Sequence, residues 1–401
     1  MGTSESFRRK IIKEFYFNPV LSCAELSRNI NKSIPLTTKL LNECVEEGLI
    51  EETGYAPSTG GRRPVTYSLR SDVLYIVSVA MDQFLTRIAL MDMQNNVVTR
   101  VETLELQLTK DAEALPALTE AINRTISQSG ISTSKIAGVG IGMPGFVDVN
   151  KGVNYTFLEV PGRSLVASIE DAVGLPVFID NDSSLIALAE LRFGAARGKN
   201  TVMVINIGWG IGLGMLLNGN LYRGNNGLAG EFSHIPMFMN NRLCGCGKSG
   251  CLETETSLTV IAQKAVEGLE AGRLSMLKGL STAHLEETVS AVLEAASKGD
   301  AFAIELLSEA GYNIGRGAAI LIHLMNPELI VLSGIGSGAG RLWLAPIQHA
   351  INQHCIPKIA ENTQVEISSL GYRAELMGAA SLVMENYDVT NYKEYDNMQT
   401  T

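Results

Sequence analysis

The sequence predicts an α/β protein that carries a winged helix-turn-helix module at its N-terminus. The chain has 401 residues, which exceeds one ordinary domain of roughly 150 residues. Its first part has the pattern of three short helices and a β-hairpin, and the remainder alternates apolar strands with amphipathic helices. We expect domains at 1–70, at 71–185 together with a C-terminal helix at about 374–386, and at 186–373.

The first 70 residues contain each element of a winged helix. Apolar spacing predicts helices over 7–15, 23–30 and 33–48, the second opened by a capping box of the Ser-x-x-Glu type. Short strands are expected at 49–52 and 65–69. The buried stripe of the third helix is expected to consist of Leu36, Leu40, Leu41, Cys44 and Val45.

The third helix is the element that enters the major groove in this plan. Arg62 and Arg63, in the polar segment between the two strands, suit phosphates or a minor groove. The same packing could serve a three-helix module that binds protein instead. The outward residues expected to contact DNA on the helix are Ser33, Thr37, Thr38, Lys39 and Asn42.

The charge is distributed unevenly between these regions. The whole chain has a net charge of −10, which by itself disfavours nucleic acid as a partner. Residues 1–70 nevertheless carry ten basic and eight acidic side chains, a net charge of +2, and the rest of the chain has −12. Operator DNA is therefore compatible with the composition, with weak non-specific affinity.

The sequence shows no pattern of secretion or membrane insertion. The positive charges near the N-terminus are not followed by the apolar core of a signal peptide. The longest uncharged run, 200–222, contains four asparagines and several glycines, so we expect two strands and a turn rather than a membrane span. Cysteine usage favours a reducing cytoplasm.

Four soft ligands form the most specific motif. His234 is followed by Cys244, Cys246 and Cys251, and three of the six cysteines of the chain fall within eight residues. One imidazole and three thiolates fill a tetrahedral zinc shell without an open position, which predicts a structural zinc ion. The alternative is three buried free cysteines and an unrelated histidine.

Polar residues follow several predicted strands of the body. A buried strand over 136–141 ends at Gly142-Met143-Pro144-Gly145, and a strand over 177–179 ends at Asp180-Asn181-Asp182, just before a helix. Functional loops of α/β proteins lie at such strand ends. Asp182 can be the N-cap of that helix or a general base that faces a cleft.

These motifs together resemble the ROK family (repressor, open reading frame, kinase), over residues 7–384. The chain is most similar to its repressor branch, the sugar-responsive transcriptional repressors of the NagC, Mlc and XylR type. The resemblance implies an actin-like, ribonuclease-H-like sugar-kinase fold of two α/β lobes with a sugar cleft between them. It rests on Gly60-Gly61-Arg62-Arg63-Pro64, Asn181-Asp182, the run from Ala229 to His234, and the run from Cys244 to Glu253.

The family resemblance also implies which residues bind the sugar. Asp182 would be the base that deprotonates the attacked hydroxyl if the chain were a kinase. His234 would touch the sugar while it binds zinc. Carboxylates and an amide suit vicinal hydroxyl groups, which both donate and accept. The implied sugar-binding residues are Asn181, Asp182, Glu231, His234 and Glu253.

Three segments depart from the kinase pattern of the family. The first phosphate loop, Asp-Gly-Gly-Thr in kinases, corresponds here to a run in which Phe84 and Leu85 replace the glycines. In the second, Trp209 replaces a threonine, and Ser333 and Ile335 interrupt the glycine run on the nucleotide side. Bulky side chains hinder the backbone from cradling phosphate. ATP is therefore not expected as a cofactor.

The sequence favours a DNA-binding transcriptional repressor whose operator affinity changes when a sugar or sugar phosphate binds. A symmetric homodimer or homotetramer would match a palindromic operator. One alternative is a ROK-type kinase of a hexose or N-acetylhexosamine with an appended DNA-binding module. A third hypothesis is a zinc-stabilised scaffold that binds only protein.

Overall fold

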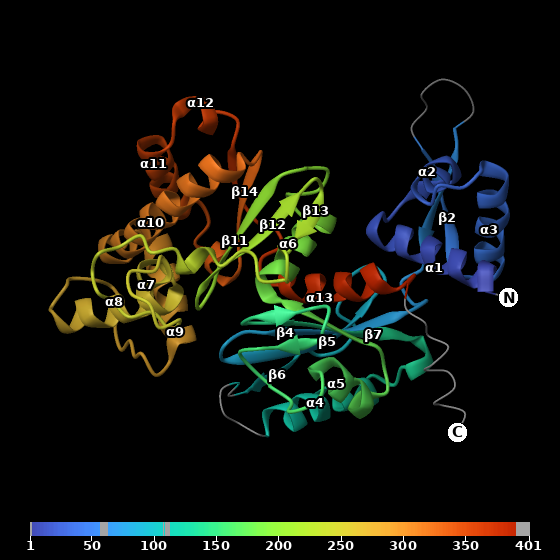
Figure 1. The fold of residues 1–401 in the computed structure, drawn as a ribbon, viewed down its shortest axis with the longest axis horizontal. Coiled ribbons are helices and arrows are strands. Elements are labelled where there is room, and N and C mark those ends of the chain that lie inside the picture. Colours follow the sequence, from blue (N-terminus) through green and yellow to red (C-terminus); the bar gives the residue numbers. More distant parts are fainter. Residues whose placement is uncertain (1, 57–62, 107, 109–112, 390–401) are drawn as a thin grey trace. The chain divides into compact units, whose positions relative to one another are not determined.

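The computed structural model of the chain describes residues 2–56, 63–106, 108 and 113–389 (Figure 1). The chain forms two compact units, the first of Met1–Asn181 and Leu376–Thr401 and the second of Asp182–Glu375. Unit 1 contains the winged helix and one α/β body, and unit 2 contains the other. The division into three domains, with the bounds given from the sequence, stays a prediction.

The winged helix has the predicted order of elements. A three-stranded sheet in the order β1-β3-β2 supports three helices. Ser22 and Glu25 form the expected capping box, in which the Glu25 carboxylate accepts from the Ser22 backbone N–H at 2.8 Å. The elements are α1 (Gly2–Phe17), β1 (Leu21–Ser22), α2 (Cys23–Asn29), α3 (Ile34–Glu46), β2 (Ile50–Tyr55) and β3 (Val65–Leu69).

The α/β body of unit 1 is built on a five-stranded sheet in the order β10-β7-β4-β5-β6. Strands β4, β7 and β10 are parallel, and β5 and β6 extend the sheet antiparallel. The strands are β4 (Tyr75–Met81), β5 (Leu85–Asp92), β6 (Glu102–Glu105), β7 (Ile136–Met143) and β10 (Val177–Asn181), and a small hairpin is formed by β8 (Val147–Asp148) and β9 (Val153–Asn154).

Helices cover both faces of this sheet, as Figure 1 shows. Helices α4 (Ala114–Ser129) and α5 (Leu165–Val173) share one hydrophobic core with the strands. On the other face α13 (Arg373–Asn386) lies so close to β7 that a Cβ on Gly140 would overlap the carbonyl group of Ala379. The C-terminal helix predicted at about 374–386 thus corresponds to α13.

Unit 2 repeats the plan with a five-stranded sheet in the order β13-β12-β11-β14-β15. The run 200–222 forms β11 and β12, as expected, and in addition the short β13. Among the described residues no helix combines the length and apolar character needed to cross a bilayer. The strands are β11 (Val202–Ile207), β12 (Ile211–Leu217), β13 (Asn220–Tyr222), β14 (Leu329–Ser333) and β15 (Gln364–Ile367).

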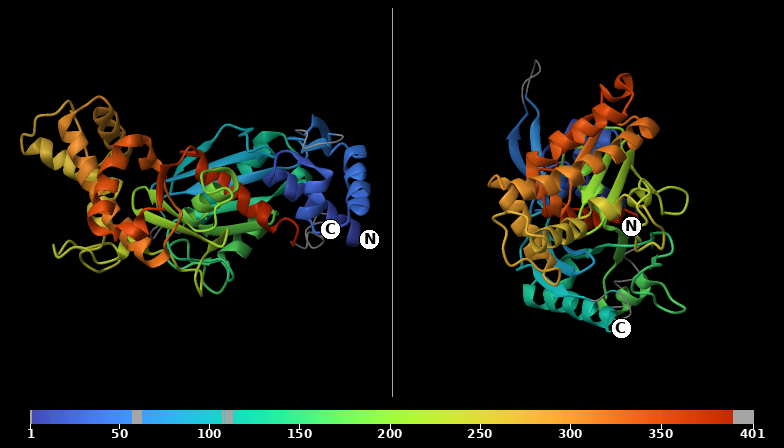
Figure 2. Two further views of the ribbon diagram at one scale, coloured as in Figure 1. Left: turned by 90° about the horizontal axis from the view of Figure 1, so that it is seen from above. Right: turned by 90° about the vertical axis from the view of Figure 1, so that its left-hand side faces the viewer.

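Helix α6 (Asp182–Phe193) packs on β12, where Gly214 leaves room for Ala187. The remaining helices gather on another side of the sheet (Figure 2) and share a core with it that includes Trp209, Phe232 and Trp343. These helices are α7 (Glu253–Thr256), α8 (Leu258–Glu270), α9 (Leu285–Ser297), α10 (Ala301–Met325), α11 (Leu344–His354) and α12 (Pro357–Ala360), with short 3-10 turns at Phe232–His234 and Ile335–Trp343.

Candidate functional site

The four predicted metal ligands converge in unit 2. The ligand atoms of His234, Cys244, Cys246 and Cys251 all lie within 4.8 Å of one another. His234 comes from the short 3-10 turn after Glu231, and the cysteines come from the loop that leads into α7. The sequence spacing therefore predicted a real three-dimensional cluster that can hold a metal ion.

The distances within the cluster fit a tetrahedral ion. The Cys246 and Cys251 sulfurs are 3.7 Å apart, and the Cys244 sulfur is 3.5 Å from His234 Nδ1. Four ligands at Zn–S bond lengths of about 2.3 Å place neighbouring sulfurs roughly 3.8 Å apart. The cysteines are free thiols rather than disulfide partners. The donor set and its spacing both fit zinc.

Burial makes a cation important for this loop. Cys244 and Cys251 are buried, and burial raises the pKa of the Cys244 thiol to about 12. A buried thiol deprotonates readily only when a metal ion compensates the negative charge. The exposed ligand Cys246 lies where the loop meets solvent. We therefore expect metal binding and ordering of this loop to be coupled.

Two carboxylates flank the metal cluster. His234 directs Nδ1 towards Cys244, while its Nε2 lies 3.7 Å from the carboxylate of Glu231. Glu253, the first residue of α7, has one carboxylate oxygen 3.7 Å from the Cys244 sulfur and the other 3.4 Å from the backbone N–H of Ile211. One imidazole thus connects the metal cluster to a carboxylate that solvent can reach.

The electrostatics of Glu231 suit recognition of a neutral polar ligand. Its side chain is 45% exposed. Burial by the surrounding protein raises its pKa, nearby Glu253 adds to this effect, and His234 opposes it. Two adjacent carboxylates form a wall of hydrogen-bond acceptors, which suits hydroxyl donors and repels anions. The wall is made of Glu231, His234 and Glu253.

Asn181 and Asp182 stand where the chain passes from unit 1 to unit 2. Asn181 ends β10, and its side-chain amide donates to the carbonyl of Gly145 at 3.3 Å. Asp182 begins α6, and one of its carboxylate oxygens accepts from the Ser183 backbone N–H at 2.7 Å. Within unit 1 the Asn181 amide is thus positioned by the Pro144-Gly145 loop, which the sequence analysis identified as the end of a buried strand.

The loop that corresponds to the first phosphate motif is closed by its own aspartate. One carboxylate oxygen of Asp82 accepts from the backbone N–H groups of Phe84 and Leu85, both at 2.8 Å. The backbone N–H of Asp82 in turn donates to the Leu85 carbonyl at 2.9 Å. Three backbone N–H groups of this loop, those of Asp82, Phe84 and Leu85, are therefore engaged within the turn.

The second phosphate motif is also engaged in packing. Trp209 is only 6% exposed and belongs to the core of unit 2. Its carbonyl accepts from the Thr259 hydroxyl at 2.9 Å, and the neighbouring Gly208 carbonyl accepts from the Leu258 N–H at 3.0 Å. The loop is thereby tied to the start of α8.

Helix α3 presents most of the predicted DNA-binding residues outward. Ser33, Thr38, Lys39 and Asn42 are exposed. Thr37 differs from the prediction, because its side chain is fully buried and its hydroxyl donates to the Ser33 carbonyl at 3.0 Å. The buried positions repeat at three and four residues, and this spacing includes position 37.

Two apolar residues at the start of α3 face outward instead of Thr37. Leu36, expected in the buried stripe, is 38% exposed, and Ile34 is 56% exposed. Sequence reasoning missed both as possible DNA contacts, because Leu36 was assigned to the buried stripe and the outward residues were chosen among polar side chains. Counting back from Leu40, Leu41 and Cys44 by helical turns could have found them. In the wing, Arg63 is exposed, whereas Arg62 lies outside the described residues.

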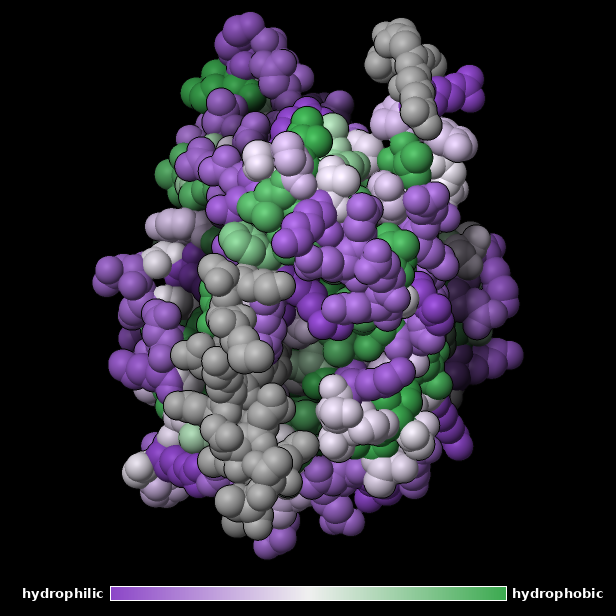
Figure 3. Space-filling view, turned by 90° about the vertical axis from the view of Figure 1, so that its right-hand side faces the viewer, coloured by the Kyte–Doolittle hydropathy of each residue, from purple (hydrophilic) through white to green (hydrophobic). Residues whose placement is uncertain are grey.

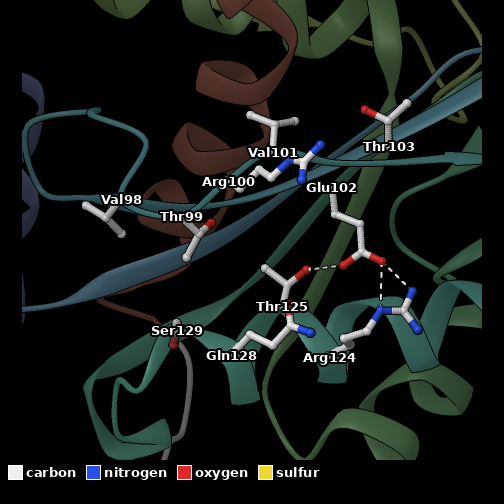
Figure 4. A pocket seen from close by; sticks show the side chains of 10 residues that line it. All are labelled: Val98, Thr99, Arg100, Val101, Glu102, Thr103, Arg124, Thr125, Gln128 and Ser129. Atoms are coloured by element: carbon white, nitrogen blue, oxygen red, sulfur yellow. Dashed lines mark hydrogen bonds and ion pairs between the residues drawn. The ribbon is translucent and has the colours of Figure 1, made fainter.

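A hollow of about 570 Å³ lies between the edge strand β6 and α4 of unit 1 (Figure 4). Glu102 points into it and accepts from Arg124 Nε at 2.9 Å and from the Thr125 hydroxyl at 3.0 Å. None of the residues predicted to bind sugar or metal lines this hollow. Its Glu102 and Arg124 side chains are paired with each other, and we do not assign the ligand site to it.

The surface view in Figure 3 shows a predominantly hydrophilic face on which hydrophobic side chains occur in separate patches. Single exposed apolar residues are normal on a protein surface. The character of this face is compatible with partners recognised through polar and charged groups.

Comparison with known proteins follows the same division of the chain. A model of the ROK family matches residues 78–386, and a model of winged helix-turn-helix DNA-binding domains matches residues 5–51. A xylose repressor of Caldicellulosiruptor bescii is 28% identical over 96% of both chains. A glucokinase of Halalkalibacterium halodurans is 35% identical over 67% of this chain and 82% of its own.

The similarity extends to three dimensions. The crystal structure of a ROK family transcriptional regulator, a homologue of the Escherichia coli Mlc protein, matches with a TM-score of 0.75 and 25% identity, over 96% of this chain and 97% of the other. The two α/β bodies have the actin-like, ribonuclease-H-like fold of the ROK sugar kinases. The chain therefore belongs to the ROK family, with a winged helix-turn-helix module ahead of its ROK domain.

Proposed function

We propose that the protein is a sugar-responsive transcriptional repressor, in which a bound sugar changes the affinity for operator DNA. The observation that carries this proposal is the combination, in one chain, of a DNA-reading helix with a carboxylate wall built on a metal cluster. The similarity to a xylose repressor over 96% of both chains supports it. By linkage, the sugar must prefer one arrangement of the protein that also differs in operator affinity.

The sugar would be held by carboxylates and an amide, with zinc as a structural ion. Glu231 and Glu253 supply acceptors from unit 2, and His234, bound to the metal through Nδ1, supplies its Nε2 N–H as a donor. We propose that Asn181 and Asp182 complete the site. Zinc bound by His234, Cys244, Cys246 and Cys251 would fix the loop that carries this wall, which is preorganisation rather than catalysis. Its contribution is to hold Glu231 and His234 in one orientation.

Engagement of both phosphate loops supports sensing rather than phosphoryl transfer. The Asp82 carboxylate takes the N–H groups of its loop, and Trp209 is packed in the core. Two of the glycines that remain have structural reasons, because a Cβ on Gly212 would overlap the Ser183 hydroxyl and one on Gly336 would overlap the Ile207 side chain. Their presence therefore does not argue for nucleotide binding.

For DNA we propose contacts of two kinds. Lys39, Arg62 and Arg63 would neutralise phosphates, whereas Ser33, Thr38 and Asn42 would contact phosphates or base edges. The exposed apolar residues Ile34 and Leu36 would lie against thymine methyl groups. Thr37 is left out of this set because it is buried.

The remaining expectations are part of the same proposal. A homodimer or homotetramer would present two reading helices to a palindromic operator. The effector is a sugar or sugar phosphate, and the wall of acceptors favours the uncharged form. We place the protein in the cytoplasm, where operator DNA and metabolised sugars meet.

A sugar kinase is the second candidate, and two observations favour it. The glucokinase of Halalkalibacterium halodurans is 35% identical over 82% of its length. Asp182, the residue that would act as general base, is retained at the start of α6. A coupled ADP-release assay with glucose, xylose and N-acetylglucosamine tests this alternative, and strong sugar-dependent turnover would favour it over the sensor.

The direct test of the repressor proposal is an operator titration. Operator fragments would be recovered by binding-site selection with the purified protein, and fluorescence anisotropy would measure their Kd with and without each sugar. We expect one sugar to change this Kd by roughly tenfold or more. Unchanged operator affinity with every sugar would refute the sensing proposal even if DNA binding stands.

A further inference from the structure

The chain passes between the two units at two points, after Asn181 and after Glu375. The first is the junction between β10 and α6, whereas the second lies inside the continuous helix α13. Helix α13 therefore starts in unit 2 and ends in unit 1. A helix of 14 residues is a stiff rod about 21 Å long, so that a rotation at one end is carried to the other.

The unit 1 end of α13 is held by α1 of the winged helix. The Lys13 ammonium donates to the Glu385 carbonyl at 2.6 Å and to the Asp388 carboxylate at 2.8 Å. The Lys13 and Asp388 side chains are only 19% and 14% exposed, so water and salt screen this ion pair less than a surface pair. Arg9, one turn earlier, lies 5.7 Å from the ring centroid of Tyr387.

A buried hydrogen bond holds the same face of α1. Tyr16 is 2% exposed, and its hydroxyl donates to the side-chain carbonyl of Asn95 at 2.6 Å. Ser381 of α13 also hydrogen-bonds the Tyr16 side chain. Asn95 lies in a left-handed turn after β5 that the Asp92 carboxylate closes through two backbone N–H groups. Tyr16 is thus hydrogen-bonded to a turn of the α/β body of unit 1 that the Asp92 carboxylate holds in place.

These contacts reach the reading helix through α1 itself. Arg9, Lys13 and Tyr16 recur at four and three residues and so lie on one face of α1. Ile11 and Phe15 of α1 are buried, and α1 is in contact with α3. Arg8 also pairs with Glu47, just after α3, at 2.8 Å. A shift of α1 would therefore move α3.

We propose that α13 transmits the state of the sugar site to the DNA-binding module, with the contacts of Lys13 to Glu385 and Asp388 and of Tyr16 to Ser381 as its grip on α1. The inference rests on the proposed function, because it concerns how sugar binding alters operator affinity. In physical terms, a sugar-dependent displacement of the unit 2 end of α13 is carried along the helix to its contacts with α1, and α1 reorients α3.

The experiment compares the unaltered full chain with Lys13→Met, Tyr16→Phe and the double variant. Lys199→Met is the matched control, since Lys199 pairs with Glu328 inside unit 2, 3.9 Å away. Anisotropy gives the operator Kd with and without saturating sugar, and calorimetry gives the sugar Kd. The probes are D-xylose, D-glucose and N-acetyl-D-glucosamine. The quantity of interest is the ratio of the two operator Kd values.

We expect the double variant to bind sugar within about threefold of the unaltered protein, while its operator Kd ratio falls towards one by at least about fivefold. The control should keep the full ratio. A ratio within twofold of the unaltered value would overturn the role of α13 while leaving sugar sensing intact. If no probe changes the operator Kd of the unaltered protein, the proposed function fails, and this inference fails with it.

Tyr16→Phe alone provides an independent criterion, because it removes a single hydroxyl and keeps the ring in the core. If the double variant does not fold, the same ratio is measured for Tyr16→Phe. A folded Tyr16→Phe protein with the full ratio would contradict the proposal, and a ratio reduced at least about twofold would support it.

Discussion

Two regions of the ROK domain differ in whether their polar groups are available to a ligand: the metal cluster with its flanking carboxylates, and the loops that correspond to the phosphate motifs. Around the metal cluster, the carboxylate of Glu231 lies beside His234, and the carboxylate of Glu253 lies beside Cys244. In the loops that correspond to phosphate motifs, the Asp82 carboxylate takes the local N–H groups and Trp209 enters the core. One region retains groups for a polar ligand, and the other has turned its groups inward.

The two regions place the requirements of sugar binding and of phosphoryl transfer on different residues. Recognition of a sugar needs acceptors and donors fixed at one wall, whereas phosphoryl transfer needs free backbone amides and room at the loops. The second requirement can be lost without the first, because the two regions depend on different residues.

The largest effect is expected where Trp209 fills the phosphate loop. Trp209→Thr restores the residue type of the kinase pattern but removes a core side chain, so we expect the free energy of unfolding to fall by about 3 kcal/mol. ADP release should stay at background. Chemical denaturation and a coupled assay measure the two quantities, and sugar-dependent turnover in the variant would contradict the packing account.

Loss of the metal should affect the opposite region. Cys246→Ser removes an exposed ligand, and we expect metal content by elemental analysis to fall and the sugar Kd to rise by roughly tenfold or more, because Glu231 and His234 lose their common support. Cys355→Ser, a buried cysteine outside the cluster, is the control. A metal-free protein with unchanged sugar affinity would refute the loop-ordering role.

Glu231→Gln tests the wall without disturbing the metal ligands. A hydrogen bond to a charged acceptor contributes about 1.5–3 kcal/mol, so the sugar Kd should rise by at least an order of magnitude while the sugar-free operator Kd stays unchanged. Titration calorimetry provides the first value and anisotropy the second. The exposed Glu267→Gln on α8 should change neither, and an equal loss in both variants would argue against a specific contact.

A smaller effect concerns Glu190 of α6, which joins the altered glycine run to the core. Its buried carboxylate accepts from Ser368 and from the backbone N–H of Ala195, and Ser333 lies 3.5 Å away. Burial raises the pKa of Glu190. Above the ordinary glutamate pKa the unfolded chain releases a proton that the folded chain keeps, so stability falls as pH rises towards the raised value.

The corresponding experiment follows unfolding free energy against pH. The stability lost between the two pKa values should be roughly 1.4 kcal/mol for each unit of the shift, and Glu190→Gln should remove this slope. An identical pH profile for the variant would show that another group titrates. The difference between the two profiles measures how much the buried carboxylate of Glu190, beside Ser333, contributes to the pH dependence of stability.

The sequence predicted much of this molecule because its strongest signals are local. Spacing alone identified the cluster from His234 to Cys251, and the capping box at Ser22 marked α2. The exchange of Leu36 and Thr37 was missed because hydrophobicity was weighed above helical period, although a threonine can be buried when its hydroxyl bonds to the preceding turn.

Other features depend on contacts that no local pattern contains. The Asp82 side chain closes its own loop through backbone groups, which composition does not reveal. Lys13 and Asp388 are 375 residues apart in sequence, and nothing near either residue predicts their pairing. Gly212 fits a phosphate-loop pattern, yet α6 requires a glycine there for its own packing.

The measurement that tests the central claim most directly is the operator Kd as a function of sugar concentration, with and without Mg-ATP. We predict that one sugar changes the operator Kd by roughly tenfold or more and that the curve is the same with and without Mg-ATP, because sensing needs the sugar wall and not the phosphate loops. A change that occurs only when Mg-ATP is present, or no change with any sugar, would contradict the account.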